Sequence, residues 1–83
     1  MTKDWEVNES HSTDGFTTST FRQVTIENSG PSDVRIRIAG NDLGILTPGA
    51  FPFDVPEPKN GDDVFVEVVR LPRTPGSKGK FIA

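Results

Sequence analysis

The chain has 83 residues with 12 acidic and 9 basic side chains, so its net charge is −3 at neutral pH, and a chain of this length forms one small domain. The absence of cysteine excludes disulfides, thiolate metal sites and thiol catalysis. The acidic balance argues against nucleic-acid binding, which usually needs a basic surplus. No run of 18 apolar residues marks a membrane span, and no apolar run near the start marks a signal peptide.

Residues 1–15 are polar apart from Trp5 and Val7, and they hold one lysine against four acidic residues. We expect this segment to be an extended N-terminal arm that is either mobile or held down by a neighbouring subunit. Trp5 and Val7 are then the arm's candidate contacts with that partner.

Two strands are predicted on either side of the turn cluster at residues 28–33. Before it, Val24 and Ile26 alternate with polar residues, and after it the segment Val34–Ile38 alternates apolar residues with arginines. A period of two is typical of a strand with one buried face. We expect the two strands to pair as a hairpin that places Glu27 opposite Arg35.

A short strand at residues 43–46 and a Pro-Gly turn at residues 48–49 come next. Phe51 and Phe53 then alternate with Pro52, and proline cannot donate to a β-ladder, which predicts an edge strand. The two phenylalanines are core residues by default, but a pair beside a turn can also anchor a partner.

The last strong strand covers residues 64–71. Three valines point to one face, while Phe65 and Val69 flank Glu67 on the other, so both faces are largely apolar. A half-exposed antiparallel sheet normally alternates apolar with polar residues. The second sheet, the arm or another subunit must therefore cover the Phe65 and Val69 face, and both residues are candidate partner contacts.

The predicted fold class is all-β, a small antiparallel β-sandwich or partly open barrel of five to six strands. The chain divides into the arm at 1–15, the sandwich at 16–71 and a basic tail at 72–83. Because the arm is acidic and the tail basic, we expect the arm of one chain to pair with the tail of a neighbour through weak, salt-screened ion pairs.

We expect no catalytic, cofactor-binding or metal-binding residues, and hence no enzyme. His11 lies in the polar arm, where a hydroxyl and a carboxylate nearby do not converge from a rigid scaffold as a triad requires. Asp62 and Asp63 are adjacent and lack the alternating spacing of a calcium loop. Arg35 and Arg37 could bind an anion, but keeping one sheet face polar explains them more simply.

Three segments resemble a pattern in small β-sandwich proteins of tailed bacteriophages: Val-Thr-Ile-Glu-Asn-Ser-Gly at 24–30, Asp-Val-Arg-Ile-Arg-Ile at 33–38 and Leu-Thr-Pro-Gly at 46–49. The resemblance implies a structural protein of the virion, such as a capsid decoration or cement protein or a minor tail protein, made in the host cytoplasm. Its implied partners are capsid or tail subunits and further copies of itself as a homo-oligomer, with no nucleic acid, membrane or small-molecule substrate.

A monomeric intracellular binding module of immunoglobulin-like type is the alternative. It would be cytoplasmic and would recognise a protein or peptide through the predicted edge strand at residues 51–55 or through the loops. In that case the arm would be dispensable.

Overall fold

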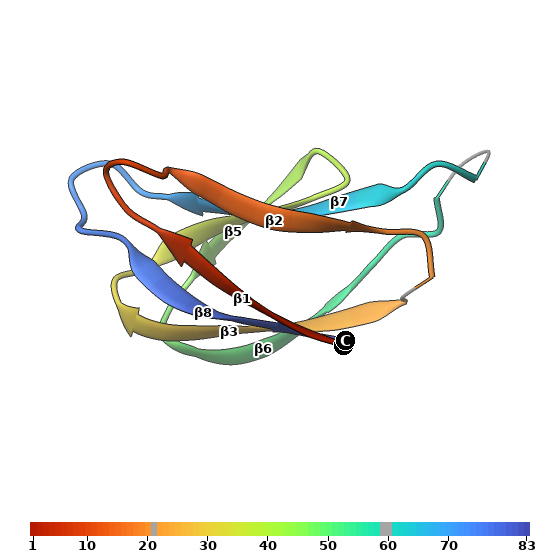
Figure 1. The fold of residues 1–83 in the computed structure, drawn as a ribbon, viewed down its shortest axis with the longest axis horizontal. Helices are drawn as coiled ribbons and strands as arrows, with labels where there is room; N and C mark the ends of the chain where they lie inside the picture. Colours follow the sequence, from red (N-terminus) through yellow and green to blue (C-terminus); the bar gives the residue numbers. More distant parts are fainter. Residues whose placement is uncertain (21, 59–60) are drawn as a thin grey trace.

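The computed structural model describes residues 1–20, 22–58 and 61–83 (Figure 1). It contains eight strands, β1 (Thr2–Val7), β2 (Thr13–Thr18), β3 (Gln23–Pro31), β4 (Val34–Ile38), β5 (Asn41–Leu46), β6 (Gly49–Asp54), β7 (Val64–Arg70) and β8 (Ser77–Ile82). The predicted all-β class is confirmed, with eight strands in place of five or six. In the part of the chain that is described, no helix is long and apolar enough to cross a membrane.

The strands form two antiparallel four-stranded sheets that pack face to face (Figure 1). Sheet A has the order β1-β8-β3-β6, and sheet B has the order β2-β7-β4-β5. Each strand of the first half of the chain pairs with a strand of the second half: β1 with β8, β2 with β7, β3 with β6 and β4 with β5. The chain is thus one long two-stranded ribbon rolled into a sandwich, which is the jelly-roll arrangement.

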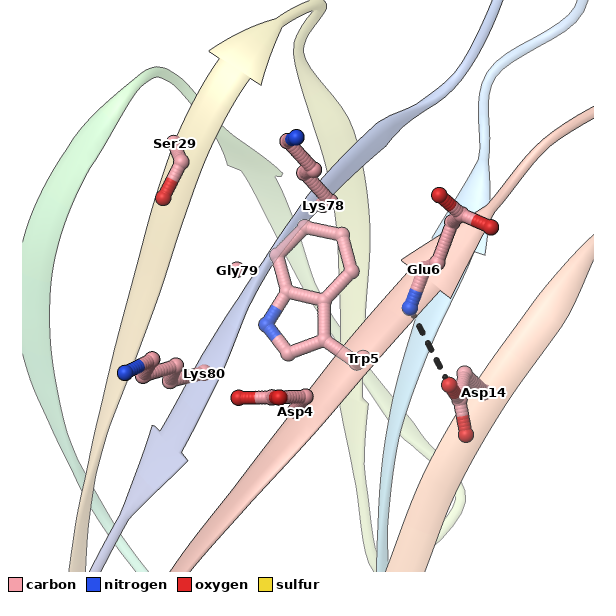
Figure 2. A pocket seen from close by; sticks show the side chains of 8 residues that line it. All are labelled: Asp4, Trp5, Glu6, Asp14, Ser29, Lys78, Gly79 and Lys80. Carbon is pink, nitrogen blue, oxygen red and sulfur yellow. Dashed lines mark hydrogen bonds between the residues drawn. The ribbon is translucent and has the colours of Figure 1, made fainter.

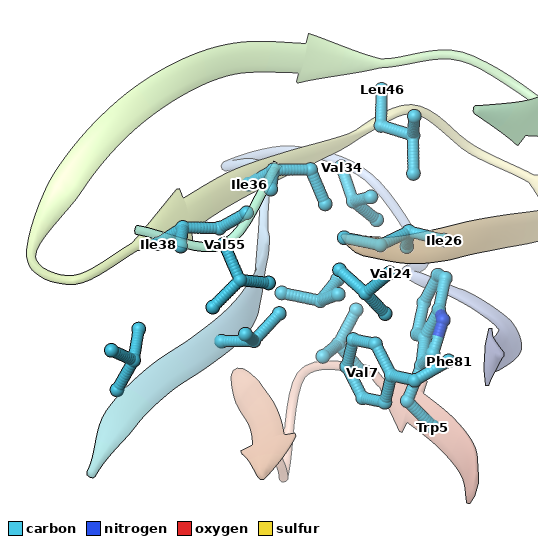
Figure 3. Packing of buried hydrophobic residues seen from close by; sticks show 13 residues of the cluster. Trp5, Val7, Val24, Ile26, Val34, Ile36, Ile38, Leu46, Val55 and Phe81 are labelled. Atoms are coloured by element: carbon cyan, nitrogen blue, oxygen red, sulfur yellow. The ribbon is translucent and has the colours of Figure 1, made fainter. Parts of the chain in front are cut away.

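The core fills the space between the sheets with alternate side chains from each (Figure 3). In β4 and β7 the predicted alternation holds, because Val34, Ile36 and Ile38 and then Val64, Val66 and Val68 are buried, while the residues between them are more exposed. The largest enclosed side chain is that of Trp5, which packs against Phe81 with ring centroids 6.3 Å apart. Strand alternation and core packing therefore agree in both sheets.

The prediction of a separate N-terminal arm and C-terminal tail is wrong. Residues 1–15 and 72–83 supply β1 and β8, which lie side by side in sheet A (Figure 1). Trp5 stands opposite Gly79, where an added Cβ would lie 2.8 Å from the Trp5 Cζ2 atom. Glycine thus makes room for the indole, and the apolar residues of β1 become core.

The opposite charges of the chain ends meet within one molecule. The β1–β8 register places Asp4 opposite Lys80 and Glu6 opposite Lys78. Both strands are members of the same sheet in the same chain, so the expected pairing between the arm of one chain and the tail of a neighbour is not the arrangement of this structure. The favourable cross-strand charge pattern instead supports the β1–β8 ladder.

The predicted hairpin between residues 24–27 and 34–38 is wrong, because β3 and β4 belong to different sheets. Glu27 stands opposite Lys80 and Ala50, and Arg35 stands opposite Ile45 and Val69. β3 ends with a cis Gly30–Pro31 bond, and the turn that follows carries the chain from one sheet to the other.

The buried side chain of Asn28 holds that crossing in place. Its amide nitrogen donates to the carbonyls of Ser32 at 2.9 Å and Leu46 at 3.1 Å. Its amide oxygen accepts from the Gly30 N–H at 2.9 Å and from the Ser77 hydroxyl. All the hydrogen-bonding groups of this amide are satisfied, and they join β3 and β8 of sheet A to β5 of sheet B.

Candidate protein-interaction site

An apolar groove of about 300 Å³ lies between the outer strand of sheet A, β6, and the outer strand of sheet B, β5. Within it, Phe51 is 39% exposed and Ile45 is 50% exposed. Phe53 is half-buried and packs against the core. The groove is lined by Ile45, Leu46, Thr47, Phe51, Pro52 and Phe53. It is called the β5–β6 groove below.

Both outer strands carry a feature that hinders the addition of a further strand. Pro52 stands opposite Thr25 of β3, and proline has no N–H to offer a further strand. The prediction of an edge strand at residues 51–55 is confirmed for β6. In the β4–β5 pair, Ile36 stands opposite Gly44 and Arg37 opposite Asp42. Leu43 of β5 is therefore an extra residue without a partner on β4, and it is 49% exposed.

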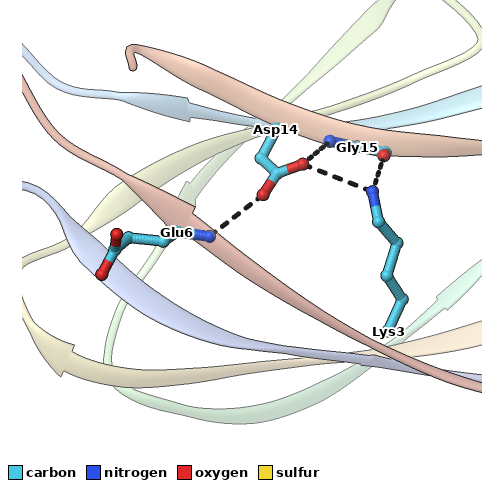
Figure 4. A network of polar contacts seen from close by, with 4 residues as sticks. All are labelled: Lys3, Glu6, Asp14 and Gly15. Atoms are coloured by element: carbon cyan, nitrogen blue, oxygen red, sulfur yellow. Dashed lines mark hydrogen bonds and ion pairs between the residues drawn. The ribbon is translucent and has the colours of Figure 1, made fainter. Parts of the chain in front are cut away.

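The opposite side of the sandwich is closed by side chains that bridge β1 and β2 (Figure 4). The Asp14 carboxylate accepts from the backbone N–H of Glu6 at 3.1 Å. The Lys3 ammonium lies 3.4 Å from the other Asp14 oxygen and also donates to the carbonyl of Gly15. These contacts occupy backbone groups that a further strand would need, and natural sheets protect their edges in such ways.

This network favours the ionised form of Asp14. Partial burial by itself raises the pKa of Asp14, but the N–H groups of Glu6 and Gly15 and the Lys3 ammonium outweigh it and hold the pKa below its ordinary value. The closed edge is therefore in place at neutral pH.

A second exposed apolar area lies on the outer face of sheet B. Phe65 is 44% exposed, and its ring lies against Gly15, where an added Cβ would be 3.0 Å from the ring. Val69 shares this face and is half-buried. Gly15 covers part of the Phe65 ring, and the predicted two-faced strand presents the rest of it to solvent.

Two ion pairs also lie on the outer face of sheet B. Arg35 pairs with Asp42, and Arg37 lies 3.6 Å from Glu67. The Gly44 N–H, together with the two guanidinium groups, lowers the pKa of Asp42 below its ordinary value. These contacts replace the expected pairing of Arg35 with Glu27. Because both arginines have acidic neighbours, the face offers no unpaired cation cluster for an anion.

A hollow of about 500 Å³ lies over the β1–β8 pair (Figure 2). Its wall includes the indole of Trp5, whose Nε1 has no hydrogen-bond partner among the described residues. Three acidic residues and two lysines surround it, and the strand register sets the lysines against two of the acids. The charges are thus nearly balanced, and the indole is 2% exposed, so we assign this hollow no ligand.

The six residues expected to contact a partner fall into three places. Phe51 and Phe53 lie together in the β5–β6 groove, and Phe65 and Val69 lie on the outer face of sheet B. Trp5 and Val7 are 2% and 1% exposed, so they belong to the core and not to a surface that a partner could reach.

Sequence reasoning missed Leu43 and Ile45 as surface residues. The signal was present, because residues 43–46 are apolar apart from a glycine and so cannot bury every side chain on one face of a strand. Among the catalytic candidates, His11, Asp62 and Asp63 are exposed. Within residues 1–20, 22–58 and 61–83, no group of three or more His, Cys, Asp or Glu side chains could hold a metal ion.

Comparison with known proteins gives no relative: no family model, curated protein or solved structure matches the chain. The function is therefore inferred from the residues and surfaces of this chain alone.

Proposed function

We propose that this chain is a non-enzymatic structural protein that binds other protein subunits through the β5–β6 groove. The observation that supports the proposal is the contrast between the two sides of the sandwich. Side-chain bridges close the β1–β2 side, whereas the β5–β6 side carries the apolar, partly exposed Phe51 and Ile45. Exposed aromatic anchors beside a pocket are typical of the centre of a protein interface.

A virion is the setting that we propose for this binding, as a capsid decoration or cement protein or a minor tail protein. The resemblance of residues 24–30, 33–38 and 46–49 to small phage proteins supports it. The jelly-roll strand order also supports it, because viral capsid subunits use this arrangement. Lectins and cupins use it too, so the support is an analogy of fold.

Two matched variants test the groove by their incorporation into purified phage virions. Phe51→Ala and Phe65→Ala remove the same ring from similarly exposed sites on different surfaces. We expect mass spectrometry to find the wild type and Phe65→Ala in the particles, and Phe51→Ala to be depleted at least about tenfold, as for an interface anchor. Equal incorporation of both variants would contradict the groove, and absence of the wild-type chain would contradict the virion setting.

A monomeric protein-binding module is the second candidate, favoured by the pairing of β1 with a strand of the same chain. An arm exchanged between subunits would have linked copies of the chain, but β1 pairs with β8 of the same chain. Light scattering on the isolated protein separates the two. A monomer that also fails to enter particles supports the module, whereas an oligomer or particle attachment supports the structural protein.

A further inference from the structure

We infer that the partner segment in the β5–β6 groove is an extended, basic and apolar stretch of polypeptide: apolar side chains enter the groove, and a lysine or arginine lies beside Asp54. The inference rests on the proposed protein-binding function. It adds the chemistry of the partner, which is argued from the charge, the backbone and the size of the groove.

The segment that forms the groove leaves one acidic side chain unpaired. Residues 39–58 include three acidic side chains and no lysine, arginine or histidine. Asp42 and Glu57 already pair with Arg35 and Arg22. Asp54, which follows the groove residue Phe53, forms no ion pair with a described residue. It is therefore the carboxylate available to a cation on the partner.

The same charge pattern argues against a second copy docked edge to edge. A second β5–β6 edge offers Asp54 no free cation, because residues 39–58 contain no lysine or arginine, and Arg22 and Arg35 are already paired. A basic partner segment supplies the missing ion pair.

The backbone of both edge strands limits the binding mode. Pro52 has no N–H, and the extra residue Leu43 interrupts the regular spacing of β5. A partner strand can make only part of a β-ladder along either edge, so side chains in the groove must supply much of the contact. A volume of about 300 Å³ suits a few apolar side chains, which an extended segment presents at every second residue.

Titration with three synthetic hexapeptides, followed by the backbone amide NMR signals of the full chain, tests this inference. Their sequences alternate valine with lysine, with glutamate or with serine. We expect the lysine peptide to shift the signals of β5 and β6 and to bind at least about tenfold more tightly than the glutamate peptide. Added salt should reduce that difference.

Substitutions locate the two contacts. Phe51→Ala should weaken all binding in the groove, while Phe65→Ala should leave it unchanged. Asp54→Asn should weaken the lysine peptide by roughly threefold to fivefold, as expected for an exposed ion pair, and leave the serine peptide unaffected. Glu9→Gln, which neutralises an exposed acid outside the groove, should change neither.

Equal binding of the lysine and glutamate peptides in the groove overturns the basic partner but leaves the proposed function standing. Absence of lysine-peptide binding at millimolar concentration also overturns the inference, and particle incorporation of Phe51→Ala then judges the proposed function separately. Shifts confined to the outer face of sheet B would contradict both.

Discussion

Asn28 shows at the scale of one residue how a polar group can specify the fold. It is 2% exposed, yet every hydrogen-bonding group of its amide has a partner. Three of those partners, the carbonyls of Ser32 and Leu46 and the hydroxyl of Ser77, lie outside β3. Such a satisfied buried network favours one arrangement of the strands, because any other arrangement leaves polar groups without partners.

Replacing Asn28 with aspartate keeps its shape but removes both donors. We expect Asn28→Asp to lower the free energy of unfolding by about 3 kcal/mol at neutral pH, because two carbonyls lose a partner and a charge is buried. Urea denaturation measures the change. Ser29→Ala, at the exposed neighbour, should stay within roughly 0.5 kcal/mol of the wild type. A loss below about 1 kcal/mol for Asn28→Asp would contradict the role of the amide.

Asp14 gives the protein a defined response to acid. Because its pKa is lower in the folded chain than its ordinary value, the ionised carboxylate stabilises the fold above that ordinary value. This stability is lost as the pH falls through the ordinary value towards the lower folded one. As the pH falls through the ordinary value of 3.8, we expect the wild type to lose stability more steeply than Asp14→Asn.

Urea denaturation at a series of pH values checks this prediction. Glu9→Gln serves as the control, because Glu9 is exposed and belongs to no network of hydrogen bonds described for the edge. Parallel pH profiles for the wild type and Asp14→Asn would show that the network does not stabilise the fold.

At the scale of the element, β1 is a structural strand and not a detachable arm. It brings two fully buried side chains, Trp5 and Val7, and it covers one side of β8. Burial of each such side chain stabilises a fold by about 1.5–3 kcal/mol, and small domains are stable by only about 5–15 kcal/mol.

Deleting residues 1–7 should therefore unfold the domain, whereas a detachable arm would leave the sandwich intact. The amide NMR spectrum of the truncated chain should lose its dispersion. In the full chain, Trp5→Ala should lower the free energy of unfolding by about 3–5 kcal/mol, as large-to-small changes in a core do. A truncated chain with a native spectrum would contradict the prediction.

At the scale of the whole molecule, the place of a strand in its sheet does not follow its place along the chain. β8 is the last strand in sequence, yet it lies between β1 and β3 in sheet A, and the backbone groups of Met1 and Ala83 bond to each other at its end. In sheet B, β7 and β4 are central in the same way, while β5 and β6 end their sheets on the groove side.

Native-state hydrogen exchange should follow that arrangement. We expect amides in β8, β3, β7 and β4 to be the most protected, because strands on both sides hold them. Amides on the free sides of β5 and β6 should exchange fastest among the strands. If β8 exchanged as fast as β5, as the terminal tail of a chain usually does, the central position of β8 would be contradicted.

The candidate site was predictable where a single strand contains the signal. The proline between Phe51 and Phe53 indicates an edge strand, and β6 is one. The alternation in β7 indicates a second apolar face, and Phe65 is exposed on it. The groove itself was not predictable, because its other wall is β5, which belongs to the other sheet.

By itself, the sequence determined the strand class, the alternation of the core in β4 and β7, and the edge position of Phe51, because these depend on neighbouring side chains and on the missing N–H of proline. Only the tertiary structure decided that residues 2–7 and 77–82 are strands, since these two segments pair with each other across about 70–80 residues of chain, with Trp5 fitted against Gly79. The tertiary structure also decided that β3 and β4 belong to different sheets. Local patterns specify a strand and its buried face, but long-range packing and the hydrogen bonds of Asn28 choose its partner.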